Sequence, residues 1–208
     1  MLKRIFLMFS IALVYWFPTR RWFSRAGATQ DEVDRVMAGD GVIANPTDTA
    51  TQAVTINAPP DAIWPWLVQL GYQRGGLYSY DWLDRLFGFL DRPSASNVLP
   101  EFQHLEVGDK IPLGPHVELT VMNVDPDRAL VLSNNMDSME WVWQFGLYPL
   151  ESNVTRLVSR GTEHMPGAIG AWFYMRLMEP AAFIMTWRML LGIKERAERL
   201  AQARSWEG

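Results

Sequence analysis

The stretch Asn57-Ala-Pro-Pro-Asp-Ala-Ile-Trp-Pro-Trp-Leu-Val-Gln-Leu-Gly71 marks a change from strand to helix. Residues 51–57 alternate, so Val54 and Ile56 share one face of a strand. The Pro pair fits a first helical turn, which needs no amide hydrogen, and the acidic residue after it suits the positive end of a helix. Apolar residues then recur at helical spacing until the final glycine. A strand feeding a helix with a large aromatic face predicts a sheet wrapped around something bulky.

The flanking sequence predicts a single α+β unit. A Thr29-x-x-Glu32 capping box opens a helix that reaches about Met37, and Ser79 is placed to cap another helix over residues 80–87. Further strands are expected at residues 117–121, 129–133, 140–148 and 154–160, after a long irregular connection with short strand pieces over residues 91–116. A long helical region follows over residues 168–203, and Pro180 is expected to divide or kink it.

Several motifs carry a family resemblance beyond the opening stretch. They are Arg74-Gly-Gly-x-Tyr-Ser-Tyr-Asp-Trp-Leu83, Val107-Gly-Asp-x-Ile-Pro-Leu-Gly114, Glu179-Pro-Ala-x-Phe-x-Met185 and Met189-Leu-Leu-Gly-Ile-Lys194. With them the chain resembles a bacterial branch of the SRPBCC superfamily, the START-like helix-grip proteins that include polyketide cyclase-type and lipid-transfer relatives. The resemblance covers roughly residues 20–203. It implies a curved antiparallel sheet around a long C-terminal helix, and it assigns no catalytic role to any residue here.

Composition leaves two interpretations of the interior open. The chain has 208 residues, 49% of them apolar, with ten Trp and eleven Met. These side chains suit an ordinary core in which Met fills the gaps, and they equally suit an apolar cavity lined by rigid aromatics and pliable thioethers. The absence of cysteine excludes a disulfide, a thiolate nucleophile and a cysteine-based metal site.

Charge divides the chain into a basic arm, residues 1–28, and an acidic domain, residues 29–208. The arm has five basic residues and no acidic one, whereas the domain has 14 basic and 23 acidic residues, a net charge of −9. An acidic domain argues against a nucleic-acid surface. A basic, apolar arm favours contact with anionic lipid, which predicts a membrane-associated protein on the cytoplasmic face, with its topology left open.

The arm contains an apolar run, Ile5 to Phe17, between pairs of basic residues. As a helix its residues reach about 20 Å, short of the roughly 30 Å hydrocarbon core. Membrane contact through residues 5–23 is expected, as a tilted spanning helix or as an interfacial one, with Trp16, Trp22 and Phe23 at the interface. A cleaved signal peptide and a helix packed on the protein or on a partner chain remain alternatives.

Templates for nucleotide and metal chemistry are missing from the sequence. There is no phosphate loop, no Gly-x-Ser-x-Gly elbow and no paired-histidine spacing among His104, His116 and His164. No cofactor and no metal are therefore expected.

Candidate ligand-binding residues are polar groups and aromatics expected near a cavity. They are Trp66, Tyr78, Tyr80, Asp81, Trp82, Trp141, Trp143, Arg160 and His164. The phenols and carboxylate of Tyr78-Ser-Tyr-Asp-Trp82 could hold a ligand hydroxyl or carbonyl, and Asp81, if buried, could act as general acid or base. The alternatives are that Asp81 supports its own helix, that Arg160 ends a surface strand, and that His164 lies in an exposed turn.

Three functions follow as hypotheses. The first is a membrane-associated protein that binds a hydrophobic small molecule such as a lipid, isoprenoid, quinone or polyketide. The second is a cofactor-free cyclase, dehydratase or hydrolase, which requires two polar groups among Tyr78, Tyr80, Asp81, Arg160 and His164 to converge in the cavity. The third is a structural or accessory subunit of a larger membrane complex, with the arm and the C-terminal helix as docking surfaces for a protein partner.

Overall fold

The structure is a computed structural model that describes residues 19–136, 139–165 and 169–207. Six strands form one antiparallel sheet in the order β1-β6-β5-β4-β3-β2. The strands are β1 (Asp48–Ile56), β2 (Lys110–Gly114), β3 (Val117–Asp125), β4 (Ala129–Met136), β5 (Met139–Glu151) and β6 (Val154–His164). The helices are α2 (Gln30–Asp34), α3 (Pro60–Val68), α4 (Asp81–Leu86), the 3-10 turn η1 (Pro100–Phe102) and α5 (Ile169–Glu207).

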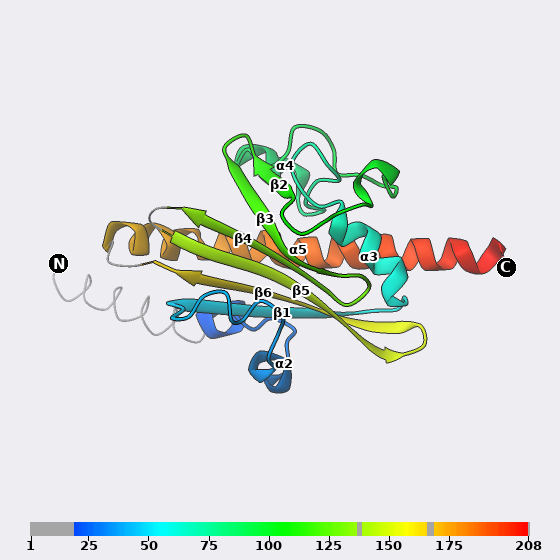
Figure 1. Cartoon of the computed structure of the whole chain (residues 1–208), viewed down its shortest axis with the longest axis horizontal. Coiled ribbons are helices and arrows are strands. Elements are labelled where there is room, and N and C mark those ends of the chain that lie inside the picture. The colour runs from blue at the N-terminus through cyan, green and yellow to red at the C-terminus, as the bar shows by residue number, and fades with distance from the viewer. Residues whose placement is uncertain (1–18, 137–138, 166–168, 208) are drawn as a thin grey trace, which may run out of the picture.

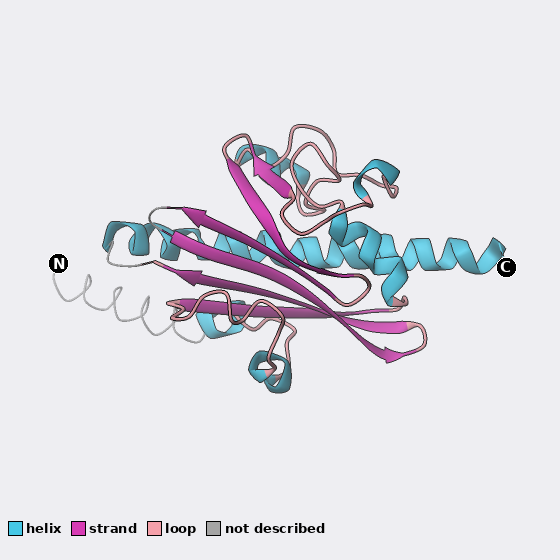
Figure 2. Cartoon of the chain, viewed as in Figure 1, coloured by secondary structure: helices cyan, strands magenta, loops and turns pink. Residues whose placement is uncertain are grey.

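The long helix α5 lies along one face of the sheet. Figures 1 and 2 show α5 running the length of the molecule behind the strands, with α3 beside its C-terminal half. Irregular register between β2 and β3, β3 and β4, and β5 and β6 bends the sheet. The expected α+β helix-grip architecture is therefore confirmed.

The decisive strand-to-helix stretch folds as its pattern predicts. β1 ends at Ile56, and α3 begins at Pro60, where proline needs no amide partner. One side of α3, including Ile63, Trp66 and Leu67, is buried against the sheet and α5. This packing closes one end of the space between α5 and the sheet.

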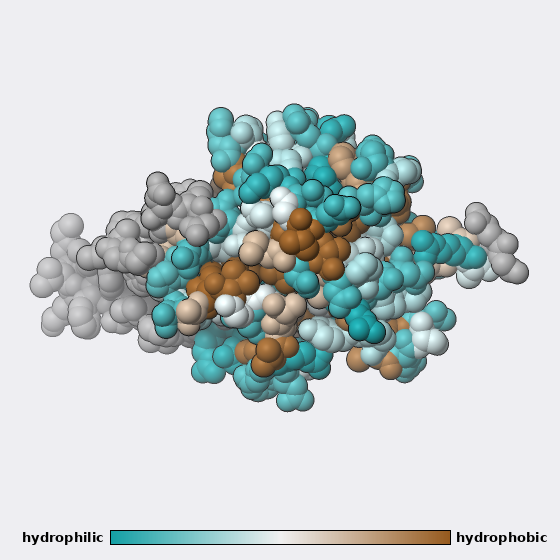
Figure 3. Space-filling view, in the orientation of Figure 1, coloured by the Kyte–Doolittle hydropathy of each residue, from teal (hydrophilic) through white to brown (hydrophobic). Residues whose placement is uncertain are grey.

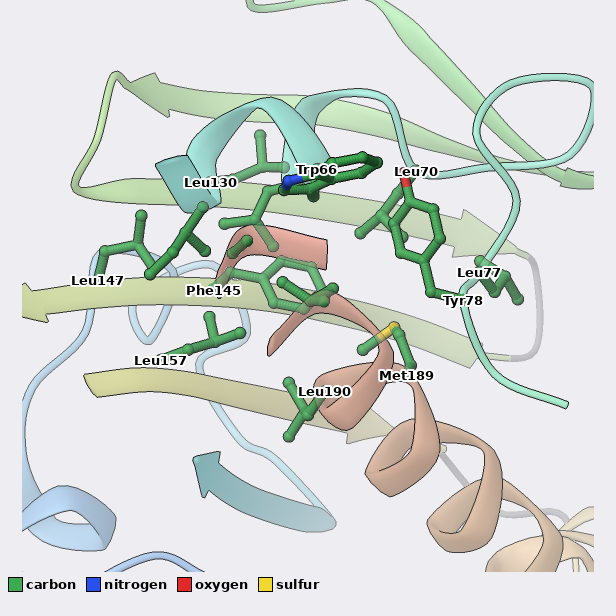
Figure 4. Close-up of a cluster of buried hydrophobic side chains, with 14 of the residues drawn as sticks. Trp66, Leu70, Leu77, Tyr78, Leu130, Phe145, Leu147, Leu157, Met189 and Leu190 are labelled. Carbon is green, nitrogen blue, oxygen red and sulfur yellow. The ribbon is translucent and has the colours of Figure 1, made fainter. Parts of the chain in front are cut away.

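The hydrophobic core lies at that closed end. Figure 4 shows side chains from α3, β4, β5, β6 and α5 converging, among them Trp66, Phe145, Leu157 and Leu190. Gly192 allows α5 to pack closely against the backbone of Tyr78, because a Cβ at position 192 would lie only 2.1 Å from the Tyr78 carbonyl oxygen. The closed end is thus solidly packed.

The opposite face of the sheet is partly covered by α2 and the loop after it. Figure 3 shows apolar groups on this face scattered among hydrophilic ones. The Thr29–Glu32 capping box is present. Its glutamate also accepts two hydrogen bonds from Arg156, at 2.6 and 2.9 Å, which ties α2 to β6.

Two local details differ from expectation. Of the two alternatives for Pro180, division of the C-terminal helix is wrong, since α5 continues through this residue. Ser79 is not the cap of α4: Tyr80 occupies that position, and the Ser79 hydroxyl donates to Asp84 Oδ1 at 2.6 Å instead.

The end of the arm packs along the edge of the sheet. A helix ends at Phe23, and the backbone amides of Thr51 and Ala53 donate to the carbonyl oxygens of Ser24 and Ala26, at 2.7 and 3.1 Å. This contact covers the exposed edge of β1. The apolar run Ile5 to Phe17 lies outside the described residues. In the part of the chain that the structure describes, no helix has the length and apolar character needed to cross a membrane.

Candidate ligand-binding site

Side-chain size along two paired strands determines where the interior is hollow. β1 and β6 are in register, so Val54 lies opposite Leu157 and Ala50 lies opposite Gly161 on the face toward α5. The first pair is large and belongs to the core. The second pair projects at most a methyl group, so the space between sheet and helix stays open there.

A cavity of about 610 Å³ occupies this space. Its walls come from the end of the arm, β1 to β6, the segment around α4, and the first half of α5. The lining residues are Phe23, Ser24, Asp48, Thr49, Ala50, Gln52, Leu77, Ser79, Phe87, Phe89, Leu113, Val117, Asn134, Met139, Trp141, Trp143, Ser159, Gly161, Glu163, Met178, Glu179, Ala181, Ala182, Phe183, Met185, Thr186 and Met189. Because Thr49, Phe87 and Ala182 are exposed, the cavity opens to the surface.

Two tryptophans form a flat wall of the cavity. Trp141 and Trp143 alternate with outward residues along β5 and project toward α5, with ring centroids 5.6 Å apart and planes 20° from parallel. The indole Nε1 of Trp143 donates to Ser159 Oγ at 3.1 Å, which fixes the ring. Met185 and Met189 face them from α5. Rigid rings on one side and flexible thioethers on the other suit an apolar guest.

Carboxylates and one guanidinium lie where the arm meets the cavity. Asp48 and Glu179 line the cavity, and Arg20 from the arm forms ion pairs with both. The Arg20 Nε donates to the two Glu179 oxygens at 2.9 and 3.1 Å. Arg20 therefore connects the arm to β1 and α5 at the rim.

Two of the nine candidate residues, Trp141 and Trp143, line the cavity. Trp66 and Tyr78 are instead buried in the core, with ring centroids 5.9 Å apart, edge to face. Burial raises the pKa of the Tyr78 phenol above its usual value, so this side chain is neutral at physiological pH. Both residues belong to the packed core and do not line the cavity.

The candidates around α4 lie outside the cavity. Tyr80 and Trp82 are 41% and 66% exposed. Asp81 accepts hydrogen bonds from the hydroxyl and backbone amide of Ser94, at 2.8 and 3.3 Å, which anchors the loop after α4.

The last two candidates, Arg160 and His164, lie on the face of the sheet that points away from the cavity. Arg160 is buried beneath α2, where it pairs with Asp40 at 2.6 Å and donates to the carbonyl oxygens of Glu32, Val33 and Arg35. His164 has the same strand parity as Arg160 and lies opposite Glu140 in the register. None of the five polar groups on which the enzyme hypothesis depended lines the cavity.

Most of the lining residues were not among the candidates chosen from the sequence, including four on β1 and β6 that shape the cavity: Ala50, Gln52, Ser159 and Gly161. Gln52 shares its strand face with Val54, so alternation alone could have identified it. Gly161 lies one residue beyond the expected end of its strand. A cluster of potential metal-binding side chains is also absent from the described residues.

Comparison with known proteins yields structural resemblance only. No family model and no curated protein matches the chain. Solved structures do match. The Zhui aromatase/cyclase from Streptomyces sp. R1128 is 15% identical, with 73% of this chain and 94% of that chain covered and a TM-score of 0.41. Norcoclaurine synthase from Thalictrum flavum is 14% identical, with 76% and 96% covered and a TM-score of 0.42.

A third match is a protein from Mesorhizobium loti, 18% identical, with 75% of this chain and 98% of that chain covered and a TM-score of 0.41. The architecture of this chain is the helix-grip fold that its resemblance to the SRPBCC superfamily implied.

Proposed function

We propose that this chain binds a hydrophobic small molecule between α5 and the sheet. The observation that carries the proposal is the cavity of about 610 Å³, open to the surface and walled by stacked Trp141 and Trp143. Its volume falls within the roughly 300–1,000 Å³ typical of small-molecule sites. A lipid, isoprenoid, quinone or polyketide-like molecule has the size and character to fill it.

The arm supports a membrane source for this molecule. Phe23 and Ser24, at the end of the arm, form part of the cavity wall. Trp22 remains 60% exposed while its ring packs edge-on against Phe183, with centroids 5.2 Å apart. An exposed tryptophan flanked by arginines is typical of a membrane interface. An arm bound to the membrane would hold the cavity rim close to the lipid from which an apolar ligand is drawn.

Binding is tested first on the full chain as purified. Native mass spectrometry is expected to show a co-purified apolar molecule that solvent extraction removes. Titration of the extracted protein with N-phenyl-1-naphthylamine is then expected to give a saturable rise in fluorescence with one site per chain. A failure to bind the dye at micromolar concentration would overturn the proposal.

Membrane association is tested by flotation of the full chain with vesicles of phosphatidylglycerol and phosphatidylcholine. The protein is expected to float with the anionic vesicles, and Trp22→Gln is expected to reduce the bound fraction. Trp82→Gln is the matched control, because that tryptophan is equally exposed but lies on α4. Equal flotation of both variants would show that Trp22 does not contribute to the membrane contact.

A further inference from the structure

Two polar side chains lie side by side in the apolar cavity. Gln52 on β1 and Ser159 on β6 are register partners that point toward α5, and both line the cavity. They are 5% and 2% exposed. The next pair along the same strands, Val54 and Leu157, belongs to the packed core. The polar pair therefore marks the inner end of the cavity.

Gln52 contributes an acceptor without a partner. Its amide Nε2 donates to the backbone carbonyl oxygen of Phe23 at 3.1 Å, and this bond fixes the orientation of the amide. The other end of the amide, Oε1, is buried and has no hydrogen-bond partner among the described residues. Buried acceptors in native proteins are nearly always satisfied by protein or water, so this one is available to a molecule that fills the cavity.

Ser159 contributes a donor beside this acceptor. Its hydroxyl oxygen accepts the indole N–H of Trp143 at 3.1 Å. Because an indole nitrogen only donates, this bond leaves the hydroxyl proton of Ser159 available to a second partner. The inner end of the cavity thus offers one acceptor and one donor from register partners on neighbouring strands.

We propose that the ligand carries an alcohol or phenol hydroxyl that binds between Gln52 and Ser159. The ligand O–H donates to Gln52 Oε1, and its oxygen accepts the hydroxyl proton of Ser159. The apolar body of the ligand lies over Ala50 and Gly161 against Trp143. This inference rests on the proposed function and narrows the ligand class.

The free acceptor at Gln52 argues against an anionic head group at this position. A carboxylate has no proton to donate to Gln52 Oε1. A neutral hydroxyl satisfies both polar side chains, because it donates to one and accepts from the other.

The test compares 2-naphthol, naphthalene and 2-naphthoate as competitors of N-phenyl-1-naphthylamine on the wild-type chain. A purely apolar cavity favours naphthalene, whereas the proposed site favours 2-naphthol, by about tenfold for one well-placed hydrogen-bond pair. Gln52→Met, nearly the same shape, is expected to abolish the preference for 2-naphthol while naphthalene still binds. Gln202→Met is the control, because that glutamine is exposed near the end of α5.

The outcomes separate the two proposals. Equal binding of 2-naphthol and naphthalene, or tighter binding of 2-naphthoate, overturns the hydroxyl site and leaves an apolar cavity. If neither the dye nor any competitor binds, the proposed function itself fails. The wild-type comparison decides these outcomes even if Gln52→Met does not fold, which circular dichroism would reveal.

Discussion

The indole Nε1 of Trp143 donates to Ser159 Oγ at 3.1 Å, from β5 to the neighbouring strand β6. Both residues are nearly buried, at 8% and 2% exposure. The bond therefore holds one wall of the cavity in place through a donor that has little access to water.

Replacing Ser159 with Ala is expected to lower the free energy of unfolding by about 1–3 kcal/mol, because it leaves a buried indole N–H without its acceptor. Urea unfolding followed by far-UV circular dichroism measures the change. In a Trp143→Phe background the same substitution is expected to cost about 1 kcal/mol less, since the donor is already gone. An equal cost in both backgrounds would show that the bond contributes nothing.

Gly161→Val is expected to block the cavity without unfolding the sheet. A Cβ at this position meets only Trp141 Nε1, at 3.7 Å, which is an ordinary contact. A β-branched residue also suits a strand interior, so a stability gain of about 0.5–1 kcal/mol is expected. Because the new side chain points into the cavity, the affinity for N-phenyl-1-naphthylamine should fall at least about tenfold, a free-energy change of about 1.4 kcal/mol.

Gly41→Ala is the control for this variant, since its added Cβ has no neighbour within 4 Å and lies in the loop after α2. Dye titration and thermal unfolding of both variants provide the comparison. Unchanged dye affinity in a folded Gly161→Val protein would place the dye outside the cavity.

Arg160→Lys is expected to separate stability from binding. The guanidinium pairs with Asp40 and donates to three carbonyl oxygens and to Thr51 Oγ1, and lysine can replace only a minority of these bonds. Hydrogen bonds of a charged group contribute about 1.5–3 kcal/mol each, so a loss of at least about 3 kcal/mol is expected in urea unfolding. Dye affinity should change less than about twofold, an equivalent of about 0.4 kcal/mol, because the side chain lies on the far face of the sheet. A large loss of dye affinity with an unchanged free energy of unfolding would indicate that Arg160 takes part in ligand binding.

The strands of the sheet could be predicted from the sequence because apolar and polar residues alternate clearly along them. The face shared by Trp141, Trp143 and Phe145 follows directly from that alternation, and two of the three line the cavity. The turn from strand to helix at Pro60 could be predicted for the same reason, since it depends on the residues immediately around it. These features depend on residues close together in the chain.

The cavity itself could not be predicted, because it depends on register between distant strands. Ala50 and Gly161 create the hollow only because they lie opposite each other, although 111 positions separate them in the chain. The burial of Arg160 likewise depends on α2 lying across the sheet. Candidate residues chosen by their chemical type, such as Tyr80 and Asp81, therefore lie outside the cavity.

Asp84→Asn is expected to stabilise the protein more at neutral than at acidic pH. The Asp84 side chain is buried, with Oδ1 accepting the Ser79 hydroxyl and Oδ2 lacking a hydrogen-bond partner among the described residues. Burial raises the pKa of this carboxyl above its ordinary value, the nearby Asp81 charge adds to the rise, and the Ser79 bond opposes it. A pKa higher in the folded than in the unfolded state means that ionisation penalises folding.

The penalty is absent below the unfolded-state pKa of about 4, where the carboxyl is protonated in both states, and complete once the pH exceeds the folded-state pKa. The stability difference between Asp84→Asn and wild type should therefore grow from pH 4 to pH 7, measured by urea unfolding at both values. Asp91→Asn, an exposed carboxylate after α4, provides the control and should show no comparable growth. A difference for Asp84→Asn that stays constant across this range would mean that the buried carboxyl does not titrate differently on folding.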